Sequence, residues 1–193
     1  AVKTETYFKP EKNGHAFAKD LVEQIVKMNH GTYLDESLEN SACTDFNIGV
    51  AGYPEKHMEA ASLEQDIYHL KKKVEAGADY IVTQMFFDNQ KYYDFVEKCR
   101  TSGINVPIIS GLKPITTKSQ LSMIPHRFKV DLPNELVIAI AKANDNKEVK
   151  EIGINWCIQQ SKDLMKNGAP VLHYYSMGKS EVVKRIASEV FKD

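Results

Sequence analysis

A helical pattern followed by a short apolar run recurs four times along this 193-residue chain. The apolar runs at 46–50, 80–87, 106–112 and 171–175 are predicted to be strands. Glycines at 77, 103 and 168 each separate a helical pattern from the next run, where a left-handed residue commonly ends a helix. This alternation is typical of βα units, and mostly apolar strands favour a parallel sheet buried on both faces.

The helical patterns cover 16–28, 62–76, 92–101, a longer paired region across 134–167, and 180–191. Ser62 and Gln65 have the spacing of a capping box at the start of one of these helices. We expect the four strands to lie parallel and adjacent, in chain order.

Four βα units leave two architectures open. Four strands cannot close into a barrel, because the usual closed size is eight. The chain is therefore either a small open α/β sheet or half of a barrel. A doubly wound sheet normally has a glycine-rich phosphate turn after its first strand. Here that turn reads Gly52-Tyr53-Pro54-Glu55, and the sequence contains neither GxGxxG nor GxxxxGK[ST].

Composition narrows the class of partner. A formal net charge of -1 and a pI near 6.7 give no electrostatic reason to expect nucleic acid or a membrane surface. No apolar run approaches the roughly 18–20 residues of a membrane span. Three scattered cysteines suit neither a disulfide framework nor a zinc site, so we expect a cytoplasmic protein without a metal. The polar start without methionine suggests a piece of a longer chain, and the absence of a composition shift suggests one domain.

Polar residues at the predicted strand ends are the candidates for chemistry, because active sites of βα barrels lie there. Gln84 is an amide within an otherwise apolar run, and a buried amide needs hydrogen-bond partners. It either bonds neighbouring side chains or holds a flat heterocycle by complementary hydrogen bonds. His173, inside the last predicted strand, is more typical of a core histidine than of a base.

The helix predicted at 62–76 carries a polar stripe of Asp66, His69 and Lys73, with Lys72 beside it. By itself such a stripe is typical of a solvated helix face with paired charges. The preceding loop contributes His57 and Glu59. Together these side chains could bind a sugar, a diphosphate and an adenine without a glycine-rich loop.

Several segments, in order over nearly the whole chain, resemble the methylenetetrahydrofolate reductase family. They are Gly49-Val50-Ala51-Gly52-Tyr53-Pro54-Glu55-Lys56-His57 with Glu59-Ala60, Thr83-Gln84-Met85-Phe86-Phe87-Asp88, Gly111-Leu112-Lys113-Pro114-Ile115, and Leu172-His173-Tyr174-Tyr175-Ser176-Met177. The YPExH and TQxFF segments at this spacing are highly specific.

The resemblance implies a TIM (βα)8 barrel, of which residues 1–193 would supply the C-terminal portion, about the last four βα units of a single FAD-binding domain. It implies that NAD(P)H reduces FAD, which then reduces 5,10-methylenetetrahydrofolate to 5-methyltetrahydrofolate. The implied FAD contacts are Ala18, Tyr53, His57, Ala60, Asp66, His69, Lys72 and Lys73. The implied substrate contacts are Gln84, Gln120 and Lys179. A homo-oligomer is compatible with this assignment, and the choice between NADH and NADPH stays open.

The chain also departs from the family pattern. Lys179 stands where arginine is usual, which keeps the charge but loses a bidentate fork suited to a carboxylate. Ile124 is aliphatic where a stacking aromatic is expected, with Phe128 nearby. The family's glutamate general acid and its Arg-Gly-Asp flavin turn are expected outside this chain, so no catalytic residue is assigned. The alternatives are a pterin-binding βα-barrel transferase without flavin and a non-catalytic βα module.

Overall fold

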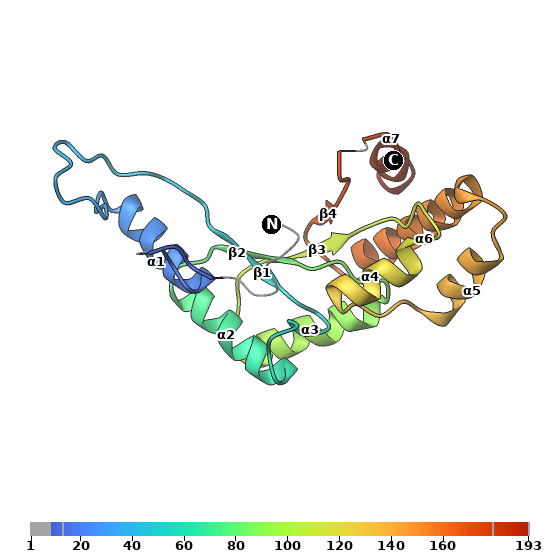
Figure 1. The fold of residues 1–193 in the computed structure, drawn as a ribbon, viewed down its shortest axis with the longest axis horizontal. Helices are drawn as coiled ribbons and strands as arrows, with labels where there is room; N and C mark the ends of the chain where they lie inside the picture. The colour runs from blue at the N-terminus through green and yellow to red at the C-terminus, as the bar shows by residue number, and fades with distance from the viewer. Residues whose placement is uncertain (1–8, 13, 179, 193) are drawn as a thin grey trace.

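The computed structural model describes residues 9–12, 14–178 and 180–192. Its core is a four-stranded parallel sheet in the order β1-β2-β3-β4, made of β1 (Gly49–Gly52), β2 (Tyr80–Thr83), β3 (Ile108–Leu112) and β4 (Leu172–Tyr174) (Figure 1). The predicted parallel order is confirmed. Within the described part of the chain each strand pairs with its neighbours in the sequence, and β1 and β4 form the two edges.

The helices are α1 (Ala18–Asn29), α2 (Leu63–Glu75), α3 (Asn89–Thr101), α4 (Gln120–Phe128), α5 (Asn134–Lys142), α6 (Asn146–Lys166) and α7 (Ser180–Val190). The predicted glycine helix ends are confirmed, since Gly77, Gly103 and Gly168 all have positive φ. Ser62 caps α2 by accepting the N–H of Gln65. The Gln65 side chain accepts the N–H of Ala61, whereas a capping box would have it accept the N–H of Ser62.

The sheet is buried on one face. Val50, Ile81, Ile108 and Leu112 point to the helices and pack in a core with side chains of α2, α3, α6 and α7. The residues that alternate with them form the inner face, where Ala51 and His173 are exposed. The prediction of strands buried on both faces is wrong for this part of the chain, and His173 is not a core histidine.

A second apolar cluster lies beyond the carboxyl ends of the strands. It joins Met85 and Phe87, which follow β2, and Ile115, which follows β3, to residues of α4, α5 and the start of α6. The loops that follow these two strands are thus held by a core of their own. Helix α6 belongs to both clusters and links them.

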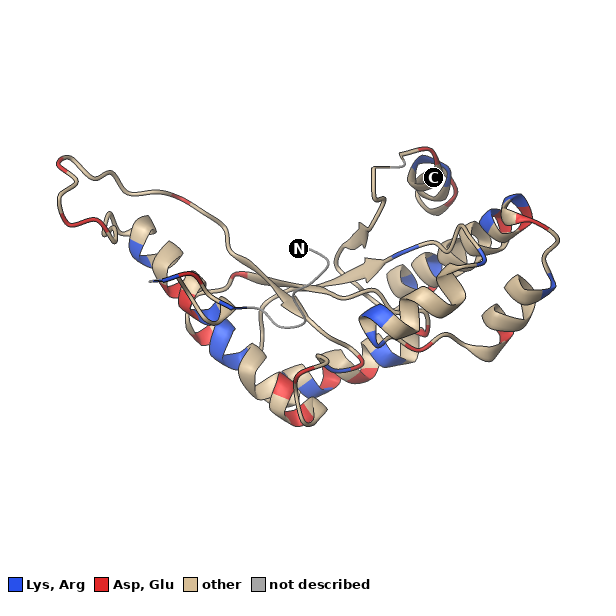
Figure 2. Ribbon diagram, viewed as in Figure 1, with Lys and Arg blue, Asp and Glu red and all other residues tan. Residues whose placement is uncertain are grey.

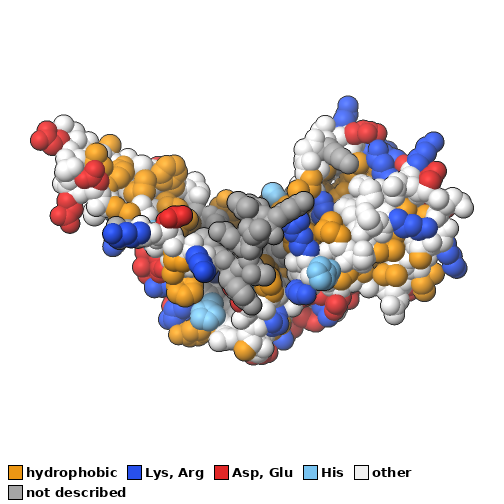
Figure 3. Space-filling view, viewed as in Figure 1, with side chains coloured by type: hydrophobic (Ala, Val, Ile, Leu, Met, Phe, Trp, Pro, Cys, Tyr) orange, Lys and Arg blue, Asp and Glu red, His pale blue; other side chains and the backbone are white. Residues whose placement is uncertain are grey.

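Charges lie on the helices and loops, whereas the four strands contain no Lys, Arg, Asp or Glu (Figure 2). Apolar side chains also gather on the long segment between α1 and β1 (Figure 3), where Leu34, Leu38 and Phe46 are exposed. Among the described residues, no helix is both long enough and apolar enough to cross a membrane.

All four strands differ in their bounds from the predicted runs, and for two of them a side-chain contact gives the reason. Residue 46 is not in β1, because the Asn29 side chain bonds both the N–H and the C=O of Phe46. β2 ends at Thr83, where the Thr83 hydroxyl oxygen accepts the N–H of Gly111 in place of a backbone carbonyl. Helix α4 was not predicted, and it contains Pro125, a residue that normally breaks helices.

Candidate functional site

The parallel strands direct their carboxyl ends, and the loops that follow, to one edge of the sheet. After β1 the chain turns through Tyr53 and His57, whose rings meet edge to face at 4.6 Å. Lys56 adopts a left-handed φ of 83°, and its Nζ donates to the carbonyls of His57 and Ala60 at 3.1 and 2.5 Å. The lysine thereby closes the turn on itself and holds His57 and Ala60 in a fixed relation.

Helix α2 is fastened to this turn by its polar face. The Asp66 carboxylate accepts the N–H of His57 at 2.8 Å, and the Lys73 ammonium donates to the carbonyl of Ala51 at 2.7 Å. Burial lowers the pKa of Lys73, and the nearby Asp66 carboxylate opposes that shift. The structure therefore brings together five of the predicted cofactor residues: Tyr53, His57, Ala60, Asp66 and Lys73.

The other three predicted cofactor residues lie at the rim of this cluster. His69 is exposed on α2, three residues beyond Asp66 and so on the same side of the helix. Lys72 is bonded to Glu75 at 2.8 Å, in an exposed pair. Ala18 is the exposed first residue of α1, and its neighbour Lys19 lies close enough to Lys72 for mutual repulsion.

Gln84 is half-buried and is the first residue after β2. The prediction that it lies within the strand is wrong. Its backbone N–H donates to Gly52, and its side-chain oxygen accepts the N–H of Met85 at 3.0 Å. Because an N–H can bond only to the oxygen of the amide, the orientation of the group is settled. Among the described residues no hydrogen bond occupies its NH₂ group, which therefore has the geometry of a free donor.

Gln120, in the first turn of α4, is arranged in the same way. Its side-chain oxygen accepts the N–H groups of Thr116 and Thr117 at 2.7 and 3.0 Å. It thus closes the loop after β3 and leaves its NH₂ as a donor. Both predicted substrate glutamines therefore suit a ligand that offers hydrogen-bond acceptors.

Tyr175 lies at this edge, although the sequence did not assign it to the site. The Tyr175 hydroxyl donates to the carbonyl of Thr83 at 2.8 Å, although β3 lies between β4 and β2. The ring passes over Gly111, where an added Cβ would lie 2.8 Å from the Tyr175 ring and 2.1 Å from the Thr83 oxygen. The alternation of side chains along a strand could have identified Tyr175, because it is two residues beyond His173 and so lies on the same inner face.

The structure does not support a ring-stacking role for Ile124, and it leaves Lys179 undescribed. Lys179 lies outside the described residues. Ile124 is fully buried in the second apolar cluster and cannot stack on a bound ring. Phe128 is partly buried against the same cluster, with the Arg127 guanidinium 5.8 Å from its ring centroid.

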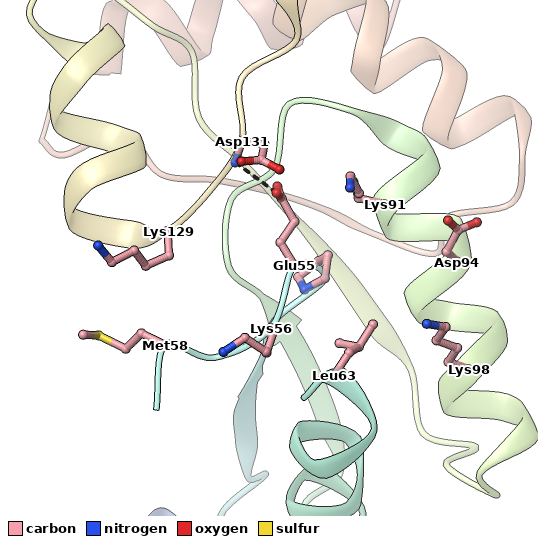
Figure 4. A pocket seen from close by; sticks show the side chains of 10 residues that line it. Glu55, Lys56, Met58, Leu63, Lys91, Asp94, Lys98, Lys129 and Asp131 are labelled. Carbon is pink, nitrogen blue, oxygen red and sulfur yellow. Dashed lines mark hydrogen bonds between the residues drawn. The ribbon is translucent and has the colours of Figure 1, made fainter. Parts of the chain in front are cut away.

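A pocket of about 600 Å³ is lined by Glu55 and Lys56 of the turn after β1 and by residues of α2, α3 and the loop after α4 (Figure 4). Glu55 lies at its centre and accepts the N–H of Asp131 at 2.9 Å. Burial raises the pKa of Glu55 to about 7, and the Asp131 N–H only partly offsets this effect. The carboxyl group therefore titrates near neutral pH.

This raised pKa makes stability depend on pH. The folded protein holds the Glu55 proton more tightly than the unfolded chain does, so the stabilisation is complete below pH 4.5 and is lost as the pH rises through about 7. Glu55→Gln keeps an acceptor for Asp131 and cannot ionise. We expect its melting temperature, relative to wild type, to be higher at pH 8 than at pH 5. Glu97→Gln, an exposed site on α3, is the control, and an equal offset at both pH values would contradict the assignment.

Comparison with known proteins places these features in a family. The sequence profile of methylenetetrahydrofolate reductase matches residues 1–190. "Methylenetetrahydrofolate reductase (NADH) 1" of Arabidopsis thaliana is 36% identical over 176 residues, which are 86% of this chain and 28% of that protein. "5,10-methylenetetrahydrofolate reductase" of Salmonella typhimurium is 34% identical over 139 residues, which are 72% of this chain and 47% of that protein.

A solved structure shares the fold. It is described as "Uncharacterized protein from Clostridium thermocellum binds two copies of 5-methyl-5,6,7,8-tetrahydrofolic acid", with a TM-score of 0.50, 19% identity, and coverage of 75% of this chain and 52% of that one. The chain spans about a quarter to a half of the length of the two reductases above. The profile match over nearly all of its residues shows that this chain belongs to the methylenetetrahydrofolate reductase family.

Proposed function

We propose that this chain forms part of a flavin-dependent enzyme that reduces 5,10-methylenetetrahydrofolate to 5-methyltetrahydrofolate with NAD(P)H, in one-carbon and methionine metabolism. One observation carries the proposal. In a chain of this family, hydrogen bonds and a ring contact hold together four residues at the strand ends: Tyr53, His57, Asp66 and Lys73. The buried, unpaired cysteines 99 and 157 favour a cytoplasmic location.

We also propose a closed barrel for the domain to which this chain belongs. The four βα units would be the last half of a (βα)8 barrel, with residues 1–193 as the C-terminal portion of one FAD-binding domain. The parallel order, the two open edges at β1 and β4, and the exposed Ala51 and His173 on the inner face support this arrangement. Four further strands would pair with both edges and cover that face.

The residues at the strand ends fit FAD chemically. Lys72 and Lys73 supply positive charge for a diphosphate, and the Asp66 carboxylate can accept from sugar hydroxyls. Tyr53 and His57 offer flat surfaces beside them, and Ala60 leaves room for close approach. Ala18 and His69 would contact the cofactor from the rim. When bound, the flavin would accept a hydride from the nicotinamide and deliver it to the folate.

Gln84, Gln120 and Lys179 would bind the substrates in turn. The NH₂ groups of the two glutamines would donate to carbonyl or ring-nitrogen acceptors of the nicotinamide and the pterin. Lys179 would meet the glutamate carboxylate of the folate through single hydrogen bonds, because an ammonium has no fork. The proton for the folate would come from a glutamate elsewhere in the longer protein.

Cofactor binding tests this proposal. The full-length protein should purify with the visible absorbance of bound flavin, whereas a pterin-binding transferase or a non-catalytic module would be colourless. We expect Lys73→Met to weaken FAD binding about 10- to 100-fold, since a hydrogen bond to a charged group contributes about 1.5–3 kcal/mol. Lys71→Met, on the same helix and half-exposed, is the control. Equal FAD titrations for both variants would exclude Lys73 from the cofactor site.

A further inference from the structure

The segment that follows Gln84 lies in the interior without strand partners. Phe86 and Phe87 are fully buried, and β2 has already ended at Thr83. Their carbonyls therefore cannot be satisfied by the sheet, and a buried carbonyl without a partner is costly. Something else must hold this part of the backbone.

Helix α6 supplies the missing donors. The Trp156 indole N–H donates to the carbonyl of Phe87 at 3.0 Å, and the Gln160 amide donates to the carbonyl of Phe86 at 3.3 Å. The two residues are four apart, so they lie on the same face of the helix. Two successive carbonyls are thus bound by two successive turns of α6.

Asn89 fixes the direction of the Gln160 amide. The Gln160 NH₂ also donates to the Asn89 side-chain oxygen at 3.1 Å, and the Asn89 NH₂ donates to the backbone carbonyl of Gln160 at 3.0 Å. Gln160 is 7% exposed, so these bonds form away from bulk water. The amide can act towards Phe86 only as a donor.

The two bonded carbonyls lie close to Gln84 in the chain. The orientation of the Gln84 amide depends on the Met85 N–H, and Met85 is the residue between Gln84 and the clamped carbonyls. We propose that Trp156 and Gln160 are positioning residues for Gln84, holding its NH₂ at the strand ends for the substrate. The inference rests on the proposed reductase function.

The test uses the full-length holoenzyme with Gln160→Met and Trp156→Phe, which keep most of the side-chain volume and remove the donor. Each should raise the KM for the folate about three- to tenfold, the effect of one weakened hydrogen bond, with FAD content unchanged. Gln159→Met, exposed on the next position of the same helix, should leave KM unchanged.

Combining each variant with Gln84→Ala separates positioning from general stability. If the clamp acts through Gln84, Gln160→Met adds no further loss in kcat/KM in the Gln84→Ala background. Additive losses, or destabilised variants with unchanged KM, would overturn the inference while leaving the proposed function standing. A wild-type protein without reductase turnover would overturn both.

Discussion

Replacing Gln84 by glutamate should lower kcat/KM for the folate about 10- to 100-fold in the full-length protein while FAD stays bound. Glutamate keeps an oxygen for the Met85 N–H, so the local fold survives. It has no N–H donor, and one or two lost hydrogen bonds of about 0.5–1.5 kcal/mol each account for most of the effect. Gln84→Ala should cause a similar loss. Steady-state kinetics with the flavin absorbance as a measure of cofactor content would test this.

Gln159→Glu makes the same chemical change at an exposed position and should leave kinetics unchanged. If Gln84→Glu turned over like wild type, the amide would serve only the backbone of Met85. The glutamine at the end of β2 would then have a local structural role, as the alternative interpretation of the sequence allowed.

Replacing Gly153 by alanine should destabilise the protein by about 2 kcal/mol or more, against the usual gain of up to about 1 kcal/mol for this change in a helix. A Cβ at Gly153 would lie 1.9 Å from the carbonyl oxygen of Ile115. Ile115 precedes the two threonines whose N–H groups Gln120 accepts. The variant should therefore also disturb the loop after β3, and urea unfolding would measure its stability.

Asn155→Ala is the matched control, since Asn155 is exposed on the same helix and alanine favours helices. It should be neutral or slightly stabilising. Equal stabilities of Gly153→Ala and wild type would mean that α6 can move away from the Ile115 loop at little cost.

The order and direction of the strands followed from the sequence because helix periodicity, glycine helix ends and apolar runs all indicated the same units. The boundaries did not, because they depend on contacts distant in the chain. Asn29 removes residue 46 from β1, and the Thr83 side chain ends β2 by bonding Gly111. Helix α4 escaped detection because its interior proline argues against a helix, whereas burial of Ile124 stabilises it.

The sequence predicted those parts of the candidate site whose residues lie close together in the chain. The Tyr53–His57 turn and the polar face of α2 are local patterns, and the structure joins them through Asp66 and Lys73. The donor direction of Gln84 and Gln120 required backbone geometry. The contact of Tyr175 with Thr83 required the sheet, since 92 residues separate the two. Strand periodicity places Tyr175 on the inner face, but it does not say which strand the ring will contact.

The agreement between strand order and chain order also bears on how the protein folds during synthesis. Each strand finds its partner in the unit made just before it, so a growing chain can add one βα unit at a time. Until the next unit emerges, the newest strand is an unpaired edge open to other chains. The species most exposed to aggregation is thus a nascent chain whose newest strand still has free backbone N–H and C=O groups.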